Sequence, residues 1–422
     1  TDDEHLPGWL LESPRTVYAG FDPTADSLHV GHLMAIMILR RFQQAGHRPI
    51  ALLGGATGMI GDPSGKSEER KLLSVDVLRA NVEAVQRQLT RFLDFDAGDN
   101  AAVLVNNYDW MGKFGYLEFL RDVGKHFPVN VMLTKDSVRS RLERTDSGLS
   151  YTEFSYMLLQ AYDFVHLYET YDCRLQVGGS DQWGNITAGI DLARRLHGVQ
   201  LYGMTCPLLT KSDGTKMGKT ESGALWLDAD KTSPYQFYQY WINLEDASVE
   251  RCLKFFTDLP VEEIDAVVQE HTQAPEKRLG QRRLAAELTR LVHGDEGLTA
   301  AERATAVLFG AEIENISDKE LGQIFADVPS TTIPKTELDG EGLSIVDAFC
   351  RCGLAKNKSE ARRIVGQGGG YVNNRRVPSR SYVELLEKDV VKFGFSSREY
   401  VLLHETSKDD DADTADAGVD MS

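Results

Sequence analysis

The feature that most limits the fold is a strand-like segment that runs directly into a helix-like one near the start of the chain. Val17 to Phe21 is a short apolar run, and a turn rich in Pro, Asp and Ser separates it from a long apolar helix at Leu33–Phe42. His29-Val30-Gly31-His32 sets two histidines and a glycine at the helix start. A helix N-terminus offers unpaired N–H groups and a positive dipole end, which attract phosphate. The segment predicts a nucleotide site at the carboxyl end of a parallel strand, although a plain helix start with one packed and one exposed histidine fits it equally well.

Strand and helix patterns alternate through the first half of the chain. The expected strands are Thr16–Phe21, Ile50–Leu53, Ala102–Asn106, Arg174–Val177 and Met204–Leu209, and the expected helices are His32–Ala45, Val75–Phe92, Thr152–Tyr168 and Asp181–Leu196. Such alternation predicts an α/β fold with a Rossmann-like, doubly wound parallel sheet. Glycines lie where three strands end, so we expect one crevice beside Gly20, Gly54/Gly55 and Gly178/Gly179.

The second half of the chain divides into smaller parts, after a catalytic domain expected at 1–230. A helical domain is expected at 231–325, with helices at Pro234–Trp241, Glu262–Gln269, Lys277–Val292 and Thr299–Phe309. Residues 311–341 have an irregular pattern, and we place a linker at 326–341. A small α+β domain at 342–405 and an acidic disordered tail at 406–422 complete the expected organisation.

Composition limits the class of protein. No run approaches the ~18 apolar residues of a membrane span, and no signal-peptide pattern is visible, so we expect a cytoplasmic protein without membrane contact. The five cysteines lack metal-ligand spacing, which favours free thiols in a reducing compartment and no protein-bound metal. The net charge of −18 argues against general nucleic-acid binding, but residues 351–380 hold eight basic residues and one acid, a local charge of +7.

Two loops carry basic residues suited to phosphate. In Lys211–Thr220, Lys216 and Lys219 are three residues apart, and flexible lysines there can clamp a polyphosphate. Gly61–Ser67 is similar to a P-loop, but its first glycine is one position late, so we reject that motif. Lys66 and Arg70 can still move onto a polyphosphate. Solvated turns are the alternative interpretation of both loops.

Polar residues recur on one face of the helix expected at Thr152–Tyr168. Tyr156, Gln160 and Asp163 fall at positions i, i+4 and i+7. The stripe is either a solvated face or part of a small-molecule pocket, and the apolar residues beside it favour the pocket. Farther on, glycines precede Asp181 at a helix start, where its carboxylate suits ribose hydroxyls or caps the helix.

Taken in order, these five segments resemble the class I aminoacyl-tRNA synthetases, and within them the bacterial-type tyrosyl-tRNA synthetases. His29-Val30-Gly31-His32 is similar to the HIGH motif of that class, and Lys216-Met217-Gly218-Lys219-Thr220 is similar to its KMSKS motif. The likeness spans nearly the whole chain. It implies a ligase that activates L-tyrosine with ATP to tyrosyl-adenylate and pyrophosphate, then transfers tyrosine to the 3′ end of tRNA(Tyr). It also implies Mg²⁺ bound with ATP and a homodimer.

The resemblance implies a role for each matching residue. In the tyrosine pocket, Tyr18 and Asp163 would bind the phenol, Asp62, Tyr156 and Gln160 the ammonium, and Gly20, Asp22 and Gln182 would line the remainder. The residues expected at ATP are Thr24, His29, Gly31, His32, Gly179 and Asp181. Those expected around pyrophosphate are Lys66, Arg70, Lys216 and Lys219, with Thr220 completing the second motif. Catalysis is therefore expected from His29, His32, Thr24 and these basic residues.

The basic region near the C-terminus resembles the RNA-binding module of small-subunit ribosomal protein S-four. The likeness rests on Leu343–Phe349, Lys358–Arg363 and Gly368–Asn374. It implies contacts with tRNA phosphates, which weaken with salt, from Lys356, Lys358, Arg362, Arg363, Arg375 and Arg376. A solvated basic surface is the alternative.

Three other functions compete with this interpretation. A tryptophanyl-tRNA synthetase lacks the phenol-reading pair and the basic C-terminal module. An RNA-binding protein built on a synthetase scaffold, such as a splicing cofactor, would bind RNA without forming an adenylate. A nucleotidyltransferase of similar fold would not explain the segment at 151–163 or the C-terminal domains.

Overall fold

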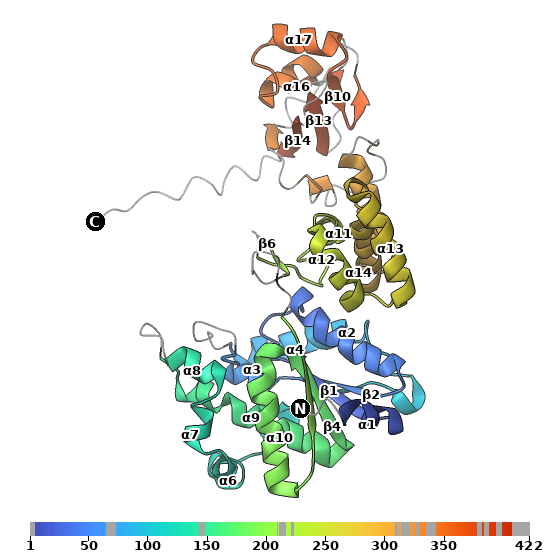
Figure 1. Ribbon diagram of the computed structural model, residues 1–422. Coiled ribbons are helices and arrows are strands. Elements are labelled where there is room, and N and C mark those ends of the chain that lie inside the picture. The colour runs from blue at the N-terminus through green and yellow to red at the C-terminus, as the bar shows by residue number, and fades with distance from the viewer. Residues whose placement is uncertain are drawn as a thin grey trace, which may run out of the picture. The chain divides into compact units, whose positions relative to one another are not determined.

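The computed structural model describes residues 5–64, 73–142, 148–208, 210, 217–220, 223–308, 311, 313, 321–322, 324–325, 330–334, 343–377, 382–383, 388–393 and 399–406. The chain divides into two compact units, residues 1–232 with 240–293, and residues 233–239 with 294–422 (Figure 1). No helix in the described ranges has the length and apolar character needed to cross a membrane.

The first unit is built on a parallel five-stranded sheet in the order β3-β2-β1-β4-β5. The strands are β1 (Thr16–Phe21), β2 (Arg48–Leu53), β3 (Val103–Asn106), β4 (Cys173–Gly179) and β5 (Tyr202–Cys206). The predicted doubly wound α/β sheet is therefore confirmed. The last expected strand, Met204–Leu209, is shorter than predicted and ends at Cys206, because Pro207 has no N–H with which to extend the ladder.

Helices cover both faces of this sheet (Figure 1). The long ones are α2 (Val30–Gln44), α4 (Val75–Leu89), α9 (Tyr151–Tyr171) and α10 (Trp183–His197). Strand order runs one way from β1 to β3 and the other way from β4 to β5, so right-handed crossovers place α2 and α4 opposite α9 and α10. The order reverses between β1 and β4, where the carboxyl ends of the strands open a crevice.

Shorter elements complete the first unit. They are α1 (Leu6–Glu12), α3 (Thr57–Ile60), α5 (Tyr108–Met111), α6 (Tyr116–Asp122), α7 (Val129–Met132), α8 (Asp136–Leu142), β6 (Lys219–Thr220), β7 (Gly223–Ala224), α12 (Asp246–Phe256), α13 (Val261–Gln273) and the 3₁₀ turns Gly98–Asn100, Gly124–His126, Ser180–Gln182 and Pro275–Lys277. The sequence pattern does not predict α1, α3, α5 to α8 or α12. Most of these span two turns or fewer, which is too short for a helical period to be visible.

Two helices, α11 (Pro234–Ile242) and α14 (Leu279–Leu308), contain residues of both units. Gly294 has φ 75° and breaks α14 into two segments. A positive φ is open to glycine without steric cost, so the helix can be interrupted there. The two segments correspond to the helices predicted at Lys277–Val292 and Thr299–Phe309.

The second unit contains a five-stranded sheet in the order β11-β10-β13-β14-β8 and two short helices. Its elements are β8 (Ser330–Pro334), β9 (Leu343–Ser344), α16 (Ile345–Arg351), α17 (Lys358–Gly366), β10 (Gly370–Val372), β11 (Arg375–Arg376), β12 (Tyr382–Val383), β13 (Lys388–Phe393) and β14 (Glu399–Thr406). A two-residue turn at Asn373 and Asn374, both with positive φ, joins β10 to β11.

One part of the predicted linker is regular rather than irregular. β8 lies within residues 311–341 and pairs in parallel with β14. The run Thr331-Thr332-Ile333 is β-branched, which favours an extended strand. The acidic tail predicted at 406–422 lies outside the described residues beyond Thr406.

A buried ion pair fixes the start of α9, the helix that carries the predicted polar stripe. Arg141 Nη2 lies 3.0 Å from Glu153 Oε2, and each side chain is 1% exposed. Arg141 also donates to the carbonyl of Gly148 at 3.0 Å, and Ser150 Oγ caps the helix by accepting from Glu153 N at 3.2 Å. These contacts tie α8 and the preceding loop to the first turn of α9.

We expect Glu153→Gln to destabilise the first unit by about 3 kcal/mol, because it leaves the Arg141 charge buried without its counterion. The free energy of unfolding, measured by urea titration with far-UV circular dichroism, checks this. The double variant Arg141→Met/Glu153→Leu should regain most of the loss, since it removes both charges. A change below about 0.5 kcal/mol in Glu153→Gln, the range of ordinary surface substitutions, would contradict the role given to the pair.

Candidate active site

A cavity of about 370 Å³ lies at the carboxyl ends of β1 and β4 in the first unit. Many residues singled out from the sequence line it, although they come from segments far apart in the chain. They are Tyr18, Gly20, Asp22, Thr24, His29, Gly31, His32, Asp62, Tyr156, Gln160, Asp163, Gly179, Asp181 and Gln182. Gly54 and Gly55 are not among the lining residues. A Cβ on Gly54 would lie 2.0 Å from Asp22 Oδ1, so this glycine instead lets that carboxylate approach the backbone.

The deep part of the cavity holds Tyr18 and Asp163, both 1% exposed. The Tyr18 ring packs edge-on against Phe164 with centroids 5.1 Å apart. The Tyr18 hydroxyl has no hydrogen-bond partner among the described residues. Burial, with the nearby Asp163, raises the pKa of this phenol well above its usual value, so it keeps its proton and can donate. A buried donor without a partner is costly, which indicates that a ligand supplies the acceptor.

Two residues outside the predicted set hold Asp163 in place. Trp110 Nε1 donates to Asp163 Oδ1 at 2.8 Å, and Asn107 Nδ2 donates to Asp163 Oδ2 at 3.0 Å. Burial raises the pKa of Asp163 to about 7, although these two hydrogen bonds act in the opposite direction. The Asp163 carboxyl is thus both oriented and poised near neutrality.

The network continues from Asp163 to Asp22 at the end of β1. Asn107 Nδ2 also donates to Thr57 Oγ1 at 3.0 Å, and Thr57 Oγ1 donates to Asp22 Oδ1 at 2.7 Å. The hydroxyl of Tyr156 donates to Asp22 Oδ2 at 2.8 Å. Both Asp22 oxygens are therefore fixed, and the side of the cavity next to β1 carries negative charge.

A second polar network surrounds Asp62, which also lines the cavity. Asp62 accepts from Gln182 Nε2 at 2.6 Å and from the backbone N–H of Ser64 at 2.9 Å. Gln182 Oε1 in turn accepts from Gln160 Nε2 at 3.3 Å and from Asn185 Nδ2 at 3.2 Å. Gln160 Oε1 lacks a partner among the described residues. It adds an acceptor to a region already rich in carboxylate, which suits a cationic group.

At the mouth of the cavity, the two histidines cap α2 reciprocally. His29 Nδ1 accepts from Gly31 N at 3.0 Å, and His32 Nδ1 accepts from His29 N at 3.1 Å. A ring nitrogen that accepts a hydrogen bond carries no proton, so in each neutral ring Nε2 carries it. Both rings line the cavity and can donate from Nε2, beside the positive end of the helix. A Cβ on Gly31 would lie 2.7 Å from the His29 ring, so glycine is required there.

The start of α2 also contacts the second predicted motif. Gly218 has φ 83°, and its N–H donates to the Tyr240 hydroxyl at 2.8 Å. A Cβ on Gly218 would lie 3.2 Å from Val30 Cβ. Lys219 and Thr220 form β6, but their side chains lie outside the described part of the chain. Lys66, Arg70 and Lys216 lie outside it entirely. Their predicted roles stay predictions.

The six predicted RNA-binding residues lie in the second unit and are exposed. Lys358 pairs with Asp347, and the Arg376 guanidinium packs over Gly368, where a Cβ would lie 1.5 Å from Nη2.

Sequence reasoning missed the residues that support the cavity, chiefly Thr57, Asn107, Trp110 and Asn185. One signal was available for Asn107, since it directly follows the end of β3 at the same sheet edge. The other three lie on helices, where nothing in the local pattern indicates that they point toward this network.

Comparisons with known proteins agree with this geometry. Residues 11–310 match the family described as tRNA synthetases class I (W and Y). The chain is 58% identical over 407 residues to a tyrosine–tRNA ligase of Rhodopirellula baltica. The aligned residues make up 96% of this chain and 92% of that relative. This chain is 54% identical over 378 residues to the tyrosine–tRNA ligase of Geobacillus stearothermophilus, with 89% and 88% covered. A C-terminally truncated mitochondrial tyrosyl-tRNA synthetase of Aspergillus nidulans aligns with a TM-score of 0.65 and 35% identity, covering 73% of this chain and 90% of that structure.

Trp110→Phe should raise the pKa of Asp163 above about 7, because it removes a hydrogen bond that favours the carboxylate while keeping an aromatic ring in place. Carbon-13 NMR titration of the Asp163 carboxyl measures this directly. Tyr162→Phe, a half-buried position on the same helix as Asp163, serves as the control and should leave the titration unchanged. An unchanged or lower pKa in Trp110→Phe would show that the indole does not orient this group.

Proposed function

The chain belongs to the class I tRNA synthetases for tryptophan and tyrosine, and from this premise we propose how its site joins L-tyrosine to tRNA(Tyr). Tyrosine–tRNA ligation itself follows from the high identity, over nearly the whole chain, to relatives with that name. The observation that best supports tyrosine as the substrate of this site is the unpartnered, buried hydroxyl of Tyr18 beside Asp163.

The reaction has two steps. An oxygen of the tyrosine carboxylate bonds to the α-phosphorus of ATP, the bond from that phosphorus to the bridging oxygen breaks, and pyrophosphate leaves. A hydroxyl of the 3′-terminal ribose of tRNA(Tyr) then bonds to the carbonyl carbon, and AMP leaves. Because the first nucleophile is already ionised, the site must position the reactants and stabilise charge rather than remove a proton.

The deep part of the cavity selects the phenol. The Tyr18 hydroxyl donates to the substrate phenol oxygen, and the substrate phenol O–H donates to the Asp163 carboxylate. Each of the three groups is then satisfied. Phenylalanine leaves Tyr18 without an acceptor, which costs about 1–3 kcal/mol for a buried polar group.

The ammonium of tyrosine occupies the acidic part of the cavity. Asp62, Tyr156 and Gln160 surround it, and the unpartnered Gln160 Oε1 accepts one of its N–H groups. Asp22, fixed by Thr57 and Tyr156, adds negative charge. This arrangement directs the carboxylate of the substrate toward the mouth of the cavity, where ATP enters.

ATP binds at the start of α2. The Nε2–H groups of His29 and His32 and the helix N-terminus donate to its phosphates, together with Thr24. A neighbouring cavity of about 120 Å³, lined by Gly31, Met34, Ala35, Gly179 and Met217 among others, suits the adenine because most of its surface is apolar. Asp181 lines the larger cavity beside Gly179, which lines both cavities, and its carboxylate accepts from the ribose hydroxyls.

Mg²⁺ enters with ATP as part of the substrate. Within the described residues, no cluster of three or more His, Cys, Asp or Glu side chains could hold a metal ion. Mg²⁺ prefers oxygen ligands, which the phosphates of ATP and water supply. Lys66, Arg70, Lys216, Lys219 and Thr220 complete the set that stabilises pyrophosphate as it leaves.

The second unit holds tRNA through the exposed basic residues of α17, β11 and the loop before α17. Lys356, Lys358, Arg362, Arg363, Arg375 and Arg376 form this surface. Phosphate contacts of this kind supply affinity that falls with salt and carries little sequence information.

A second copy of the chain covers an apolar surface of the first unit. Large hydrophobic side chains of α6, α7 and the start of α9 are exposed there, for example Leu117 at 78%, Tyr116 at 65%, Tyr151 at 62% and Val129 at 59%. Exposed apolar side chains gathered in this way mark an interaction surface.

The free state of all five cysteines fits a protein working in a reducing cytoplasm.

Exchange of radioactive pyrophosphate into ATP should require tyrosine when all twenty amino acids are tested singly. Adenylate formation reverses without tRNA, so this assay isolates the first step. Transfer to tRNA(Tyr) is measured separately with labelled tyrosine. Exchange supported equally by tryptophan, or RNA binding without any exchange, would contradict the assignment.

Tyr18→Phe should lower kcat/KM for tyrosine by roughly five- to 150-fold, the kinetic equivalent of about 1–3 kcal/mol. The kcat/KM for phenylalanine should not fall, because in the variant this substrate no longer leaves a buried donor unpaired. Steady-state exchange with both amino acids gives the ratio, with Tyr162→Phe as the matched control. Equal losses for both substrates would count against a phenol-reading role.

A further inference from the structure

The turn from Asp22 to His29 joins the two halves of the reaction site. Asp22, Thr24 and His29 line the same cavity. In the proposed function, Asp22 lies beside tyrosine, whereas Thr24 and His29 lie beside ATP. The distance between the reactants therefore depends on the conformation of Pro23–Leu28. A backbone bridge holds the end of the turn at His29, where the N–H of Leu227 donates to the carbonyl of Leu28 at 2.9 Å and the N–H of Val30 donates to that of Leu225 at 3.0 Å. The remainder of the turn lies outside the regular elements, and side chains help to hold it.

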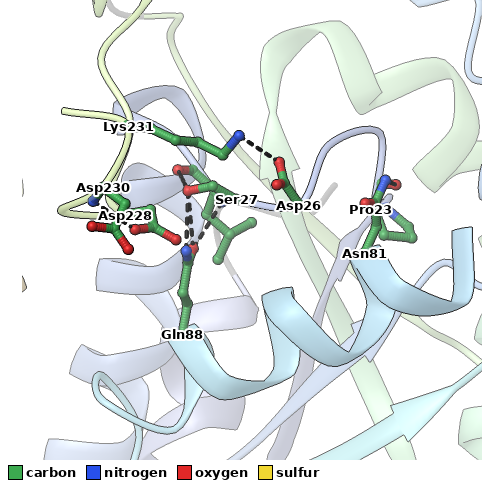
Figure 2. Close-up of polar contacts among 9 residues, drawn as sticks. Pro23, Asp26, Ser27, Asn81, Gln88, Asp228, Asp230 and Lys231 are labelled. Carbon is green, nitrogen blue, oxygen red and sulfur yellow. Dashed lines mark hydrogen bonds and ion pairs between the residues drawn. The ribbon is translucent and has the colours of Figure 1, made fainter. Parts of the chain in front are cut away.

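Gln88 of α4 forms hydrogen bonds with the end of the turn nearest His29 (Figure 2). Its Oε1 accepts from the backbone N–H of Leu28 at 2.8 Å, and its Nε2 donates to Ser27 Oγ at 3.0 Å. Ser27 Oγ donates in turn to the carbonyl of Leu28 at 2.8 Å. Gln88 is 9% exposed and Ser27 3% exposed, so water does not replace these bonds readily.

The same helix holds the other end of the turn. Asn81 Nδ2 donates to the carbonyl of Pro23 at 3.0 Å, and Asn81 is 5% exposed. Asn81 and Gln88 are seven residues apart, which places them on one helix face. On the outer side of the turn, Lys231 pairs with Asp26 at 2.8 Å (Figure 2). The Lys231–Asp26 pair is largely exposed and contributes little to stability.

The described residues of α4 do not line the reactant cavity. Two buried amides on an otherwise apolar helix face carry a desolvation cost, and here all of their observed bonds go to one turn. An apolar side chain would pack against the turn but would not define its backbone position. A small displacement of His29 relative to Asp22 would separate the α-phosphate from the carboxylate that attacks it, and a misplacement near 1 Å can cost about a hundredfold in rate.

We propose that Gln88, assisted by Asn81, is a positioning residue for tyrosine activation: its amide sets the Ser27–Leu28 backbone and through it the place of His29 at ATP. This inference rests on the proposed function. It predicts a loss in the chemical step and at ATP, while tyrosine binding at Tyr18 and Asp163 persists, because that end of the cavity is held by β1, Asn107 and Trp110.

The first test compares Gln88→Met with wild type in pyrophosphate exchange, using the full chain. We expect kcat to fall roughly ten- to a hundredfold and KM for ATP to rise, with KM for tyrosine within about twofold of wild type. Gln86→Met is the matched control, since Gln86 is exposed on the same helix. Wild-type exchange with tyrosine tests the proposed function separately, and far-UV circular dichroism shows whether each variant folds.

The second test uses Gln88→Glu and keeps the inference falsifiable if Gln88→Met does not fold. A glutamic acid that carries its proton offers a carbonyl acceptor and an O–H donor, the pattern of the glutamine amide. As a carboxylate it cannot donate to Ser27. The ratio of variant to wild-type kcat should therefore rise as the pH falls through the pKa of the introduced carboxyl, which burial raises above its usual value of about 4. Far-UV circular dichroism at each pH distinguishes this change in kcat from a loss of structure, because an ionised buried carboxylate can also destabilise the fold.

Unchanged kcat in folded Gln88→Met would overturn the proposal. Equal increases in the KM values for ATP and tyrosine would also overturn it. The same holds if the ratio of Gln88→Glu to wild-type kcat does not depend on pH.

Discussion

The site depends on the parallel pairing of β1 with β4, where the direction of strand order reverses. The chain leaves β1 and β4 toward helices on opposite faces of the sheet, so a crevice stays open between the carboxyl ends of these two strands. Tyr18 and Asp22 come from β1 and the turn after it, and Gly179 ends β4. Most of the polar groups around the cavity are brought to this opening by α2, α9 or the loops that follow the strands.

Within that opening, buried polar groups are satisfied by one another in two connected sets. One runs from Trp110 through Asp163, Asn107 and Thr57 to Asp22, and the other surrounds Asp62. A fully paired network fixes side chains more firmly than apolar packing does. Among the described residues that line the cavity, the exceptions are Tyr18 Oη, Gln160 Oε1 and Gln176 Oε1, and these atoms mark where a ligand completes the pairing.

The sequence predicted the elements whose pattern is local and repeated. The strands of the sheet follow from short apolar runs that alternate with helical patterns, and the stripe of Tyr156, Gln160 and Asp163 follows from the 3.6-residue period of a helix. Contacts that depend on tertiary structure could not be predicted this way: Trp110 meets Asp163 across 53 residues, and Gln88 meets Leu28 across 60. β8 was missed because its partner, β14, lies far along the chain. The roles of the lysines in the second motif stay predictions.

The reciprocal cap at the start of α2 restricts which side chains can occupy positions 29 and 32. Each ring presents an acceptor to the backbone, and in the proposed function its other nitrogen donates to ATP. Lysine or arginine could donate but not accept, and serine or aspartate could cap but not reach outward. An asparagine has both groups, but on one carbon and at shorter reach. Replacement of either histidine by one of these residues would thus keep the cap of α2 or the donor for the ligand, but not both, because only the imidazole combines the two at this reach.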